Sequence, residues 1–158
     1  MVIKLVVALA LGLIVGIERE FVGKEAGTKT YSLVTLGAAL FTILSFDPNF
    51  PDPSRIIAQI ITGIGFIGAG AILRPTSGRG SVVGLTTAAT LWVVCGLGIA
   101  VGMGFYFESI VTTALVFFTF LFLSKIVNKV RVYTKAHPVK YTGEADEEHF
   151  DTEETREH

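Results

Sequence analysis

Polar side chains are rare in the first 124 residues of this 158-residue chain, so those inside apolar stretches are the candidates for chemistry. Arg55 and Gln59 stand four residues apart, which places both on one face of a helix. Polar groups at membrane depth are costly unless paired or hydrated, so this face should point into a helix bundle. Two interpretations stay open: a hydrogen bond from Gln59 to Thr86 or Thr87, or a polar pocket for an ion or small ligand.

A second charged group, Glu18-Arg19-Glu20, closes the first apolar run. It can anchor a helix at the membrane edge through an ion pair with Arg74 or Arg79. It can equally place a carboxylate at the mouth of a cation path, because hard cations such as Mg²⁺ prefer oxygen ligands. No cofactor is expected, and Mg²⁺ stays a possible ligand. The candidate pocket residues are therefore Glu18, Arg19, Arg55, Gln59, Arg74, Thr86 and Thr87.

Enzymatic chemistry is not expected from this chain. The three histidines all fall in the polar tail, away from the apolar runs. The single cysteine, Cys95, excludes an internal disulfide and a multi-cysteine metal site. No Ser/His/Asp or Cys/His arrangement is available within one compartment, so no catalytic residue is proposed.

The stretch 59–74, which makes up most of the third apolar run, is rich in glycine. Its segment 63–68 matches the dinucleotide-binding pattern G-x-G-x-x-G, which also needs a preceding strand and an acidic residue about 20 positions later. No Asp or Glu occurs between Asp52 and Glu108, so we reject that interpretation. Glycines cost helix stability, so close approach of other helices explains them better. We expect this helix to be the most enclosed of the bundle. The predicted packing residues are Gly63, Gly65, Gly68, Gly70, Phe66 and Trp92.

Hydropathy predicts an all-α membrane protein, a polytopic bundle of about five transmembrane helices. The apolar runs cover approximately 2–17, 31–46, 54–73, 85–101 and 105–123, near the lower limit of about 17 residues for a spanning helix. Thr30 or Ser32 could cap the second helix. Asp52 followed by Pro53 is typical of a helix start and should begin the third. The phenylalanine-rich fifth run is expected on the lipid-facing outside.

The charge distribution predicts two regions and an orientation. Residues 1–124 form the membrane domain, and 125–158 form a short cytoplasmic tail, first basic and then acidic, too polar to build a core and partly disordered. Basic residues favour the cytoplasmic side, and with the N-terminus outside the outer segments hold only Lys4 and Arg55. We therefore predict N-terminus out and C-terminus in. The basic stretch beside the last span suits membrane lipid rather than nucleic acid.

Several motifs follow one another in a recognisable order: Glu18-Arg19-Glu20, Ala26-Gly27, and the segments 36–41, 52–59, 63–70 and 84–92. Together they resemble the MgtC/SapB (YhiD) family of membrane proteins over roughly residues 5 to 123. The resemblance implies a multi-pass protein of the cell inner membrane with about five spans. It also implies a link to magnesium homeostasis and to virulence, through survival inside host cells.

The resemblance further implies a regulator that acts on other membrane proteins, including the F-type ATP synthase. The alternative is a transporter or channel for a cation or small solute, with a polar cavity lined by the third helix. Five short spans make a small pore on their own, so both functions favour a homo-oligomer, most simply a homodimer. Two departures from the family are visible: Val83 stands where many relatives carry a basic residue, and the tail replaces a folded cytoplasmic domain.

Overall fold

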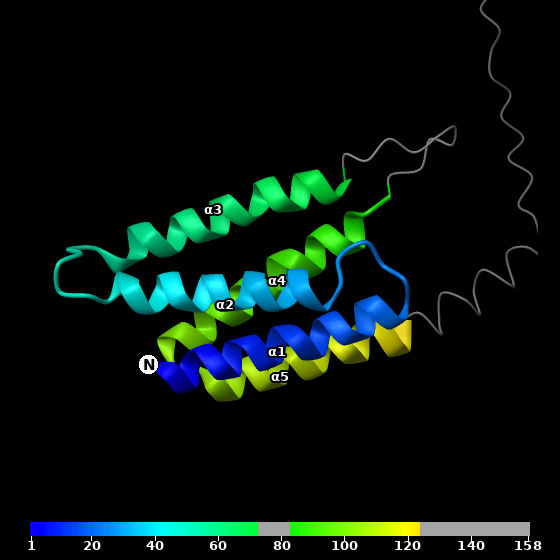
Figure 1. The fold of residues 1–158 in the computed structure, drawn as a ribbon, viewed down its shortest axis with the longest axis horizontal. Coiled ribbons are helices and arrows are strands. Elements are labelled where there is room, and N and C mark those ends of the chain that lie inside the picture. Colours follow the sequence, from blue (N-terminus) through cyan, green and yellow to red (C-terminus); the bar gives the residue numbers. More distant parts are fainter. Residues whose placement is uncertain (73–82, 124–158) are drawn as a thin grey trace, which may run out of the picture.

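The computed structural model describes residues 1–72 and 83–123. These residues form five α-helices and no strand: α1 Val2–Phe21, α2 Thr28–Ser45, α3 Pro53–Ile72, α4 Leu85–Met103 and α5 Tyr106–Phe118, which continues as the short π-helix η1 Thr119–Leu123. Successive helices run in opposite directions, so the start of α1 and the end of η1 lie at opposite ends of the bundle (Figure 1). The predicted all-α class is confirmed. Arg74, Arg79 and the tail from 125 lie outside the described residues.

The start of α3 agrees with the sequence-based prediction, whereas the start of α2 does not. α3 begins at Pro53 as predicted, and Asp52 Oδ1 accepts a hydrogen bond from the Ser54 backbone N–H at 3.0 Å. The second helix begins earlier than expected, and neither Thr30 nor Ser32 caps it. Glu20 at the end of α1 instead accepts hydrogen bonds from the backbone N–H of Thr28, at 3.0 Å, and from its hydroxyl. A carboxylate is favourable at this position because the helix N-terminus carries partial positive charge.

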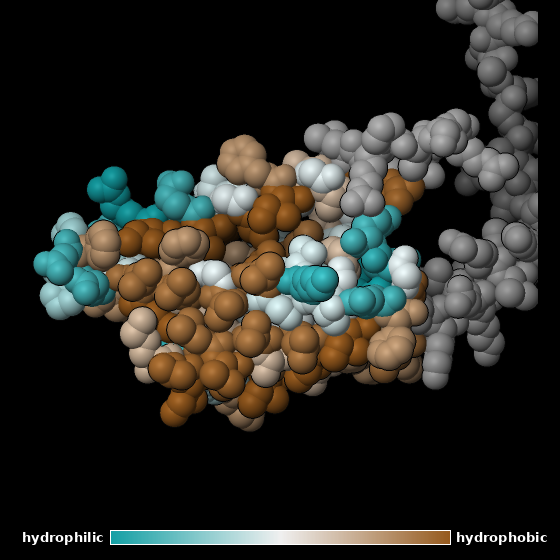
Figure 2. Space-filling model, in the orientation of Figure 1, coloured by the Kyte–Doolittle hydropathy of each residue, from teal (hydrophilic) through white to brown (hydrophobic). Residues whose placement is uncertain are grey.

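The surface and the helix lengths suit a bilayer. A helix of 20 residues, such as α3, is about 30 Å long, the thickness of the hydrocarbon core. By length and composition, α3 and α4 are apolar enough to cross a membrane. Hydrophobic residues cover the middle of the face in Figure 2, and hydrophilic residues gather toward the two ends. That all five helices cross, and in which orientation, remain predictions.

Helix α2 forms the centre of the bundle because glycines on two neighbours let it approach closely. A Cβ atom added to Gly12 of α1 would lie 2.6 Å from the Thr35 hydroxyl oxygen. One added to Gly98 of α4 would lie 2.3 Å from the Thr35 carbonyl oxygen, and one added to Gly102 would lie 2.7 Å from Thr42 Cβ. No larger residue fits at these positions without separating the helices. The core is therefore held by backbone-to-backbone packing of α1, α2 and α4.

The prediction that the third helix is the most enclosed is wrong for the described chain. Ile64 is its only buried residue, and Phe66 is 79% exposed. A Cβ atom added to Gly63, Gly65 or Gly70 would meet nothing within 4 Å, and one added to Gly68 would only touch Ala88 at 3.7 Å. The physical reason is that the close glycine contacts along the helices fall on α2. α3 receives one only at its end, where a Cβ atom added to Gly84 would lie 2.1 Å from the Ala71 carbonyl oxygen, so α3 lies at one edge of the bundle (Figure 1).

The two aromatic residues predicted to fill space beside these glycines do not do so. Trp92 of α4 is 57% exposed, and Phe66 points away from the described chain's core. The fifth helix behaves as its composition indicates: it buries Ser109 and Thr113 and exposes large apolar side chains such as Phe107. The buried hydroxyls of α5 bond to the carbonyl oxygens four residues earlier, at the N-cap Phe105 and at Ser109, so they need no partner on another helix.

Two glycines of α4 provide a matched test of this packing. We expect Gly98→Ala to lower the free energy of unfolding by about 1–3 kcal/mol, because the new methyl group meets the α2 backbone. Gly96→Ala, two residues away, meets nothing within 4 Å and should raise helix stability by up to about 1 kcal/mol. Thermal unfolding in detergent measures both. Equal melting temperatures for the two variants would contradict the packing described here.

Candidate functional site

A buried polar cluster lies where the end of α1 meets α2 and α4. Arg19 is only 4% exposed, and its Nη2 donates a hydrogen bond to the Thr87 hydroxyl at 3.4 Å. Thr87 in turn donates to Glu25 Oε2 at 3.3 Å. The guanidinium also lies 4.8 Å above the centre of the Phe120 ring, a cation–π arrangement. A charge that cannot be neutralised is thus held inside the protein by hydroxyl and aromatic contacts.

Four buried polar atoms have no hydrogen-bond partner among the described residues, and the first three belong to this cluster. They are Glu18 Oε2, Arg19 Nε, Tyr31 Oη and Ser32 Oγ. Arg19, Thr90 and Glu18 are the polar neighbours of the Tyr31 hydroxyl. Each buried polar group without a partner costs about 1–3 kcal/mol, so such a group calls for a specific explanation. The cluster has spare hydrogen-bonding capacity and is the best-defined polar site of the described chain.

Arg55 and Gln59 lie near the start of α3, at the opposite end of the bundle, and both are exposed. They line a pocket of about 490 Å³ together with Asp52 and their apolar neighbours. Hydrogen bonds from Ser54 lower the pKa of Asp52, with a further contribution from nearby Arg55, so this carboxylate is ionised at neutral pH. The predicted shared face of Arg55 and Gln59 therefore exists, but it faces outward beside a loop rather than into the bundle.

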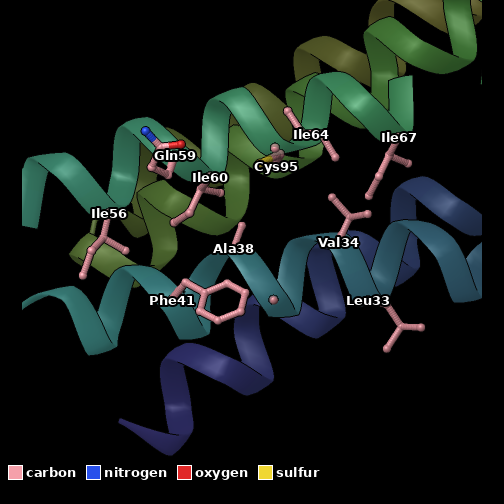
Figure 3. Close-up of a pocket in the computed structure, with 12 residues that line it drawn as sticks. Leu33, Val34, Ala38, Phe41, Ile56, Gln59, Ile60, Ile64, Ile67 and Cys95 are labelled. Carbon is pink, nitrogen blue, oxygen red and sulfur yellow. The ribbon is translucent and has the colours of Figure 1, made fainter. Parts of the chain in front are cut away.

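Gln59 also lines an apolar groove of about 550 Å³ between α2 and α3. Figure 3 shows the side chains of Ile56, Ile60 and Ile67 directed toward α2, with Cys95 of α4 behind them. Among the residues that line this groove, only Gln59 has an amide side chain that can form hydrogen bonds. The groove is lined by Leu33, Val34, Gly37, Ala38, Phe41, Ile56, Gln59, Ile60, Gly63, Ile64, Ile67 and Cys95.

The structure thus divides the predicted pocket residues into separate groups. Arg19 and Thr87 meet, with Glu18 beside them, whereas Arg55 and Gln59 lie at the other end. Thr86 is exposed and lines a third groove, of about 320 Å³, between α4 and α5. Arg74 lies outside the described residues. None of the grooves found in the described chain joins these groups into one cavity.

The expected hydrogen bond from Gln59 to Thr86 or Thr87 is not formed, because the two ends are separated by most of the length of α3. Sequence reasoning did not select Tyr31 and Phe120, which lie against Arg19, or Glu25, which accepts a hydrogen bond from Thr87. Glu25 carried a usable signal, since it is the only acidic residue of the loop between α1 and α2. Phe120 carried none, because its contact with Arg19 spans about 100 residues of sequence.

Comparison with known proteins agrees with the arrangement of motifs along these helices. The model of the MgtC family matches residues 5–129. The chain belongs to the MgtC family. Proteins of the MgtC family are membrane-associated, in agreement with α3 and α4, the two helices of the described residues that are long and apolar enough to cross a membrane. No solved structure matches the chain.

Curated relatives in the MgtC family cover most of the chain. Protein SapB of Bacillus subtilis is 39% identical over 81% of this chain and 58% of its own length. Protein MgtC of Salmonella typhimurium is 36% identical over 82% of this chain and 54% of its own length. YhiD of Escherichia coli, whose name reads "Putative magnesium transporter", is 44% identical over 66% of this chain and 52% of its own length. The chain therefore spans about half the length of these relatives.

Two adjacent threonines test whether the buried cluster is structurally important. Thr87→Val keeps the shape of the side chain but removes the hydroxyl that joins Arg19 to Glu25. We expect it to lower the free energy of unfolding by about 1–3 kcal/mol, because a buried charge loses its partner. Thr86→Val, at an exposed position, should change it by less than about 0.5 kcal/mol. Chemical denaturation in detergent checks both, and a neutral Thr87→Val would show that the Arg19 contact contributes nothing.

Proposed function

We propose that this MgtC-family protein is a non-enzymatic, multi-pass regulator of the inner membrane that is linked to magnesium homeostasis. It acts by binding other membrane proteins through exposed helix faces, with the F-type ATP synthase as the partner class. The observation that carries this proposal is the surface of α3, a helix of membrane length that buries only Ile64 within the described chain.

The chemistry of this helix supports a role in binding protein rather than in binding solute. Gly65 and Gly70 present bare backbone, and Phe66 projects between them with 79% of its surface exposed. Small residues allow a second helix to approach closely in a membrane, and an aromatic side chain supplies a large contact area. The same face would serve a homodimer, which we propose as the resting form of the protein.

The magnesium link rests on the names of relatives, since both MgtC and YhiD are in the family and YhiD is named for magnesium transport. Because the chain spans about half of these proteins, their complete activity is not transferred to it. What this chain shares with them is the helical region, and the proposed function is confined to it.

The alternative function is a transporter or channel for a cation or small solute. One observation favours it: the cluster around Arg19 contains three buried polar atoms, on Glu18, Arg19 and Tyr31, with no hydrogen-bond partner among the described residues. Against it stands the separation of this cluster from Arg55 and Gln59, since transport needs polar groups along the whole path. The positive charge of Arg19 inside the cluster also opposes a cation at that point.

Photo-crosslinking tests the regulator. A photoreactive phenylalanine analogue replaces Phe66 of α3 or, as a control, Phe107 of α5, which are 79% and 75% exposed. We expect position 66 to capture membrane subunits of the ATP synthase in cells, and position 107 to capture few. Capture of a second copy of this chain at position 66 would support the homodimer. Equal capture at both positions would contradict a partner-binding role for α3.

Flux measurements test the alternative. Purified protein in proteoliposomes is compared with Glu18→Gln and Gln59→Leu for movement of Mg²⁺ and other cations. The regulator predicts no flux above that of empty vesicles for any of the three proteins. Flux in the wild type that falls at least tenfold in Glu18→Gln, with unchanged thermal stability, would establish transport and overturn the regulator as the sole function.

A further inference from the structure

The groove between α2 and α3 has the dimensions and lining of a binding site for an apolar chain. Its volume of about 550 Å³ lies within the range of about 300–1,000 Å³ typical of small-molecule sites. Two facing glycines create the space, since a Cβ atom added to Gly37 or to Gly63 would meet nothing within 4 Å. Figure 3 shows isoleucine side chains of α3 along its length.

This groove leads into the polar pocket at the start of α3. Ile56 and Gln59 line both, so the two volumes adjoin. The polar pocket, of about 490 Å³, contains Arg55 and Asp52, and it lies at the end of the bundle where hydrophilic residues gather (Figure 2). An apolar slot that opens beside charged groups at the edge of a membrane-length helix matches the shape of a lipid, with a chain and a headgroup.

The two charges of the pocket select the headgroup. Asp52 and Arg55 attract each other, and the Arg55 backbone N–H bonds to Asp52. Both side chains are nonetheless exposed and line the same pocket, so a ligand there can reach both charges. Asp52 accepts hydrogen bonds from Ser54, at 3.0 Å from the backbone nitrogen and at 2.6 Å from the hydroxyl, which keep it ionised. A guanidinium binds phosphate through paired hydrogen bonds, and a carboxylate binds a primary ammonium. One positive and one negative group in the same pocket complement a zwitterionic headgroup.

We propose that this site binds a phosphoethanolamine lipid, with an acyl chain in the α2–α3 groove, the phosphate on Arg55 and the ammonium on Asp52. The chain fixes the position of the lipid but adds little preference, because the surrounding lipid tails are equally apolar. The headgroup sets the preference. A glycerol headgroup leaves Asp52 facing a lipid of net negative charge, and a choline headgroup has no N–H group to donate. The site does not depend on the regulatory function proposed above.

Native mass spectrometry of the full chain in detergent tests the headgroup. The protein is titrated with phosphatidylethanolamine, phosphatidylglycerol or phosphatidylcholine of the same chain length. We expect the wild type to retain phosphatidylethanolamine at least about fivefold better than either other lipid, a difference of about 1 kcal/mol. Arg55→Gln should abolish this preference. Asp52→Asn, which keeps an oxygen to accept from Ser54, should shift it toward phosphatidylglycerol. Equal retention of the three lipids by the wild type, or a preference for another, overturns the proposal.

Glycine variants test the groove independently of the headgroup. A Cβ atom added to Gly63 of α3 or to Gly37 of α2 would meet nothing within 4 Å, so Gly63→Leu and Gly37→Leu each place a larger apolar side chain in the groove. Each should lower lipid retention at least fivefold. Gly65→Leu is the matched control, since a Cβ atom there also meets nothing within 4 Å but Gly65 does not line the groove, and its lipid retention should equal that of the wild type. Melting temperatures confirm that each variant is folded. Unchanged retention in both groove variants overturns the assignment of the acyl chain to this groove.

Discussion

The close approach of α2 to α1 and α4 is the constraint on which the rest of the structure depends. In a bilayer no hydrophobic effect drives helices together, so tight packing must hold them. Gly12, Gly98 and Gly102 supply it by letting neighbouring backbones touch α2. This arrangement buries Tyr31 completely and brings Arg19 to Thr87. It also leaves α3 and α5 at the periphery, where their apolar faces are available to lipid or to other proteins.

The sequence predicted the helices well because their boundaries are local signals. Prolines and the Asp52–Pro53 pair fixed the start of α3, and Gly104, with φ of 101°, adopts the left-handed conformation that ends α4. The prediction that α3 is the central helix was wrong because the number of glycines in a helix does not show which other helix packs against them. Spacing was the better signal. The paired glycines of α1, Gly12 and Gly16, and of α4, Gly98 and Gly102, are four residues apart and lie on one face, whereas those of α3 spread around the helix.

The candidate site was predicted only in part, because the sequence shows which face of a helix a residue occupies but not which helix that face meets. The rule that polar groups in apolar helices point inward holds for Arg19 and Thr87, which are both buried and hydrogen-bonded to each other. It fails for Arg55, which is within three residues of the helix start and can reach water along the surface. Helical periodicity places residues on a face but does not say how deep they lie or which helix they meet. The Arg19–Phe120 contact depends on both.

The position of α4 in the chain has a consequence for biosynthesis. This helix contacts α1, α2, α3 and α5, yet three of its four partners leave the ribosome before it does. Before α4 is synthesised, the only tightly packed pair among the described helices is α1 with α2. α3 then still lacks its main partner, because it contacts α4 more than α2. The bundle therefore cannot assemble until α4 has been made. A chain truncated before α4 would lack the common partner of every earlier helix, which makes it a natural substrate for membrane quality control.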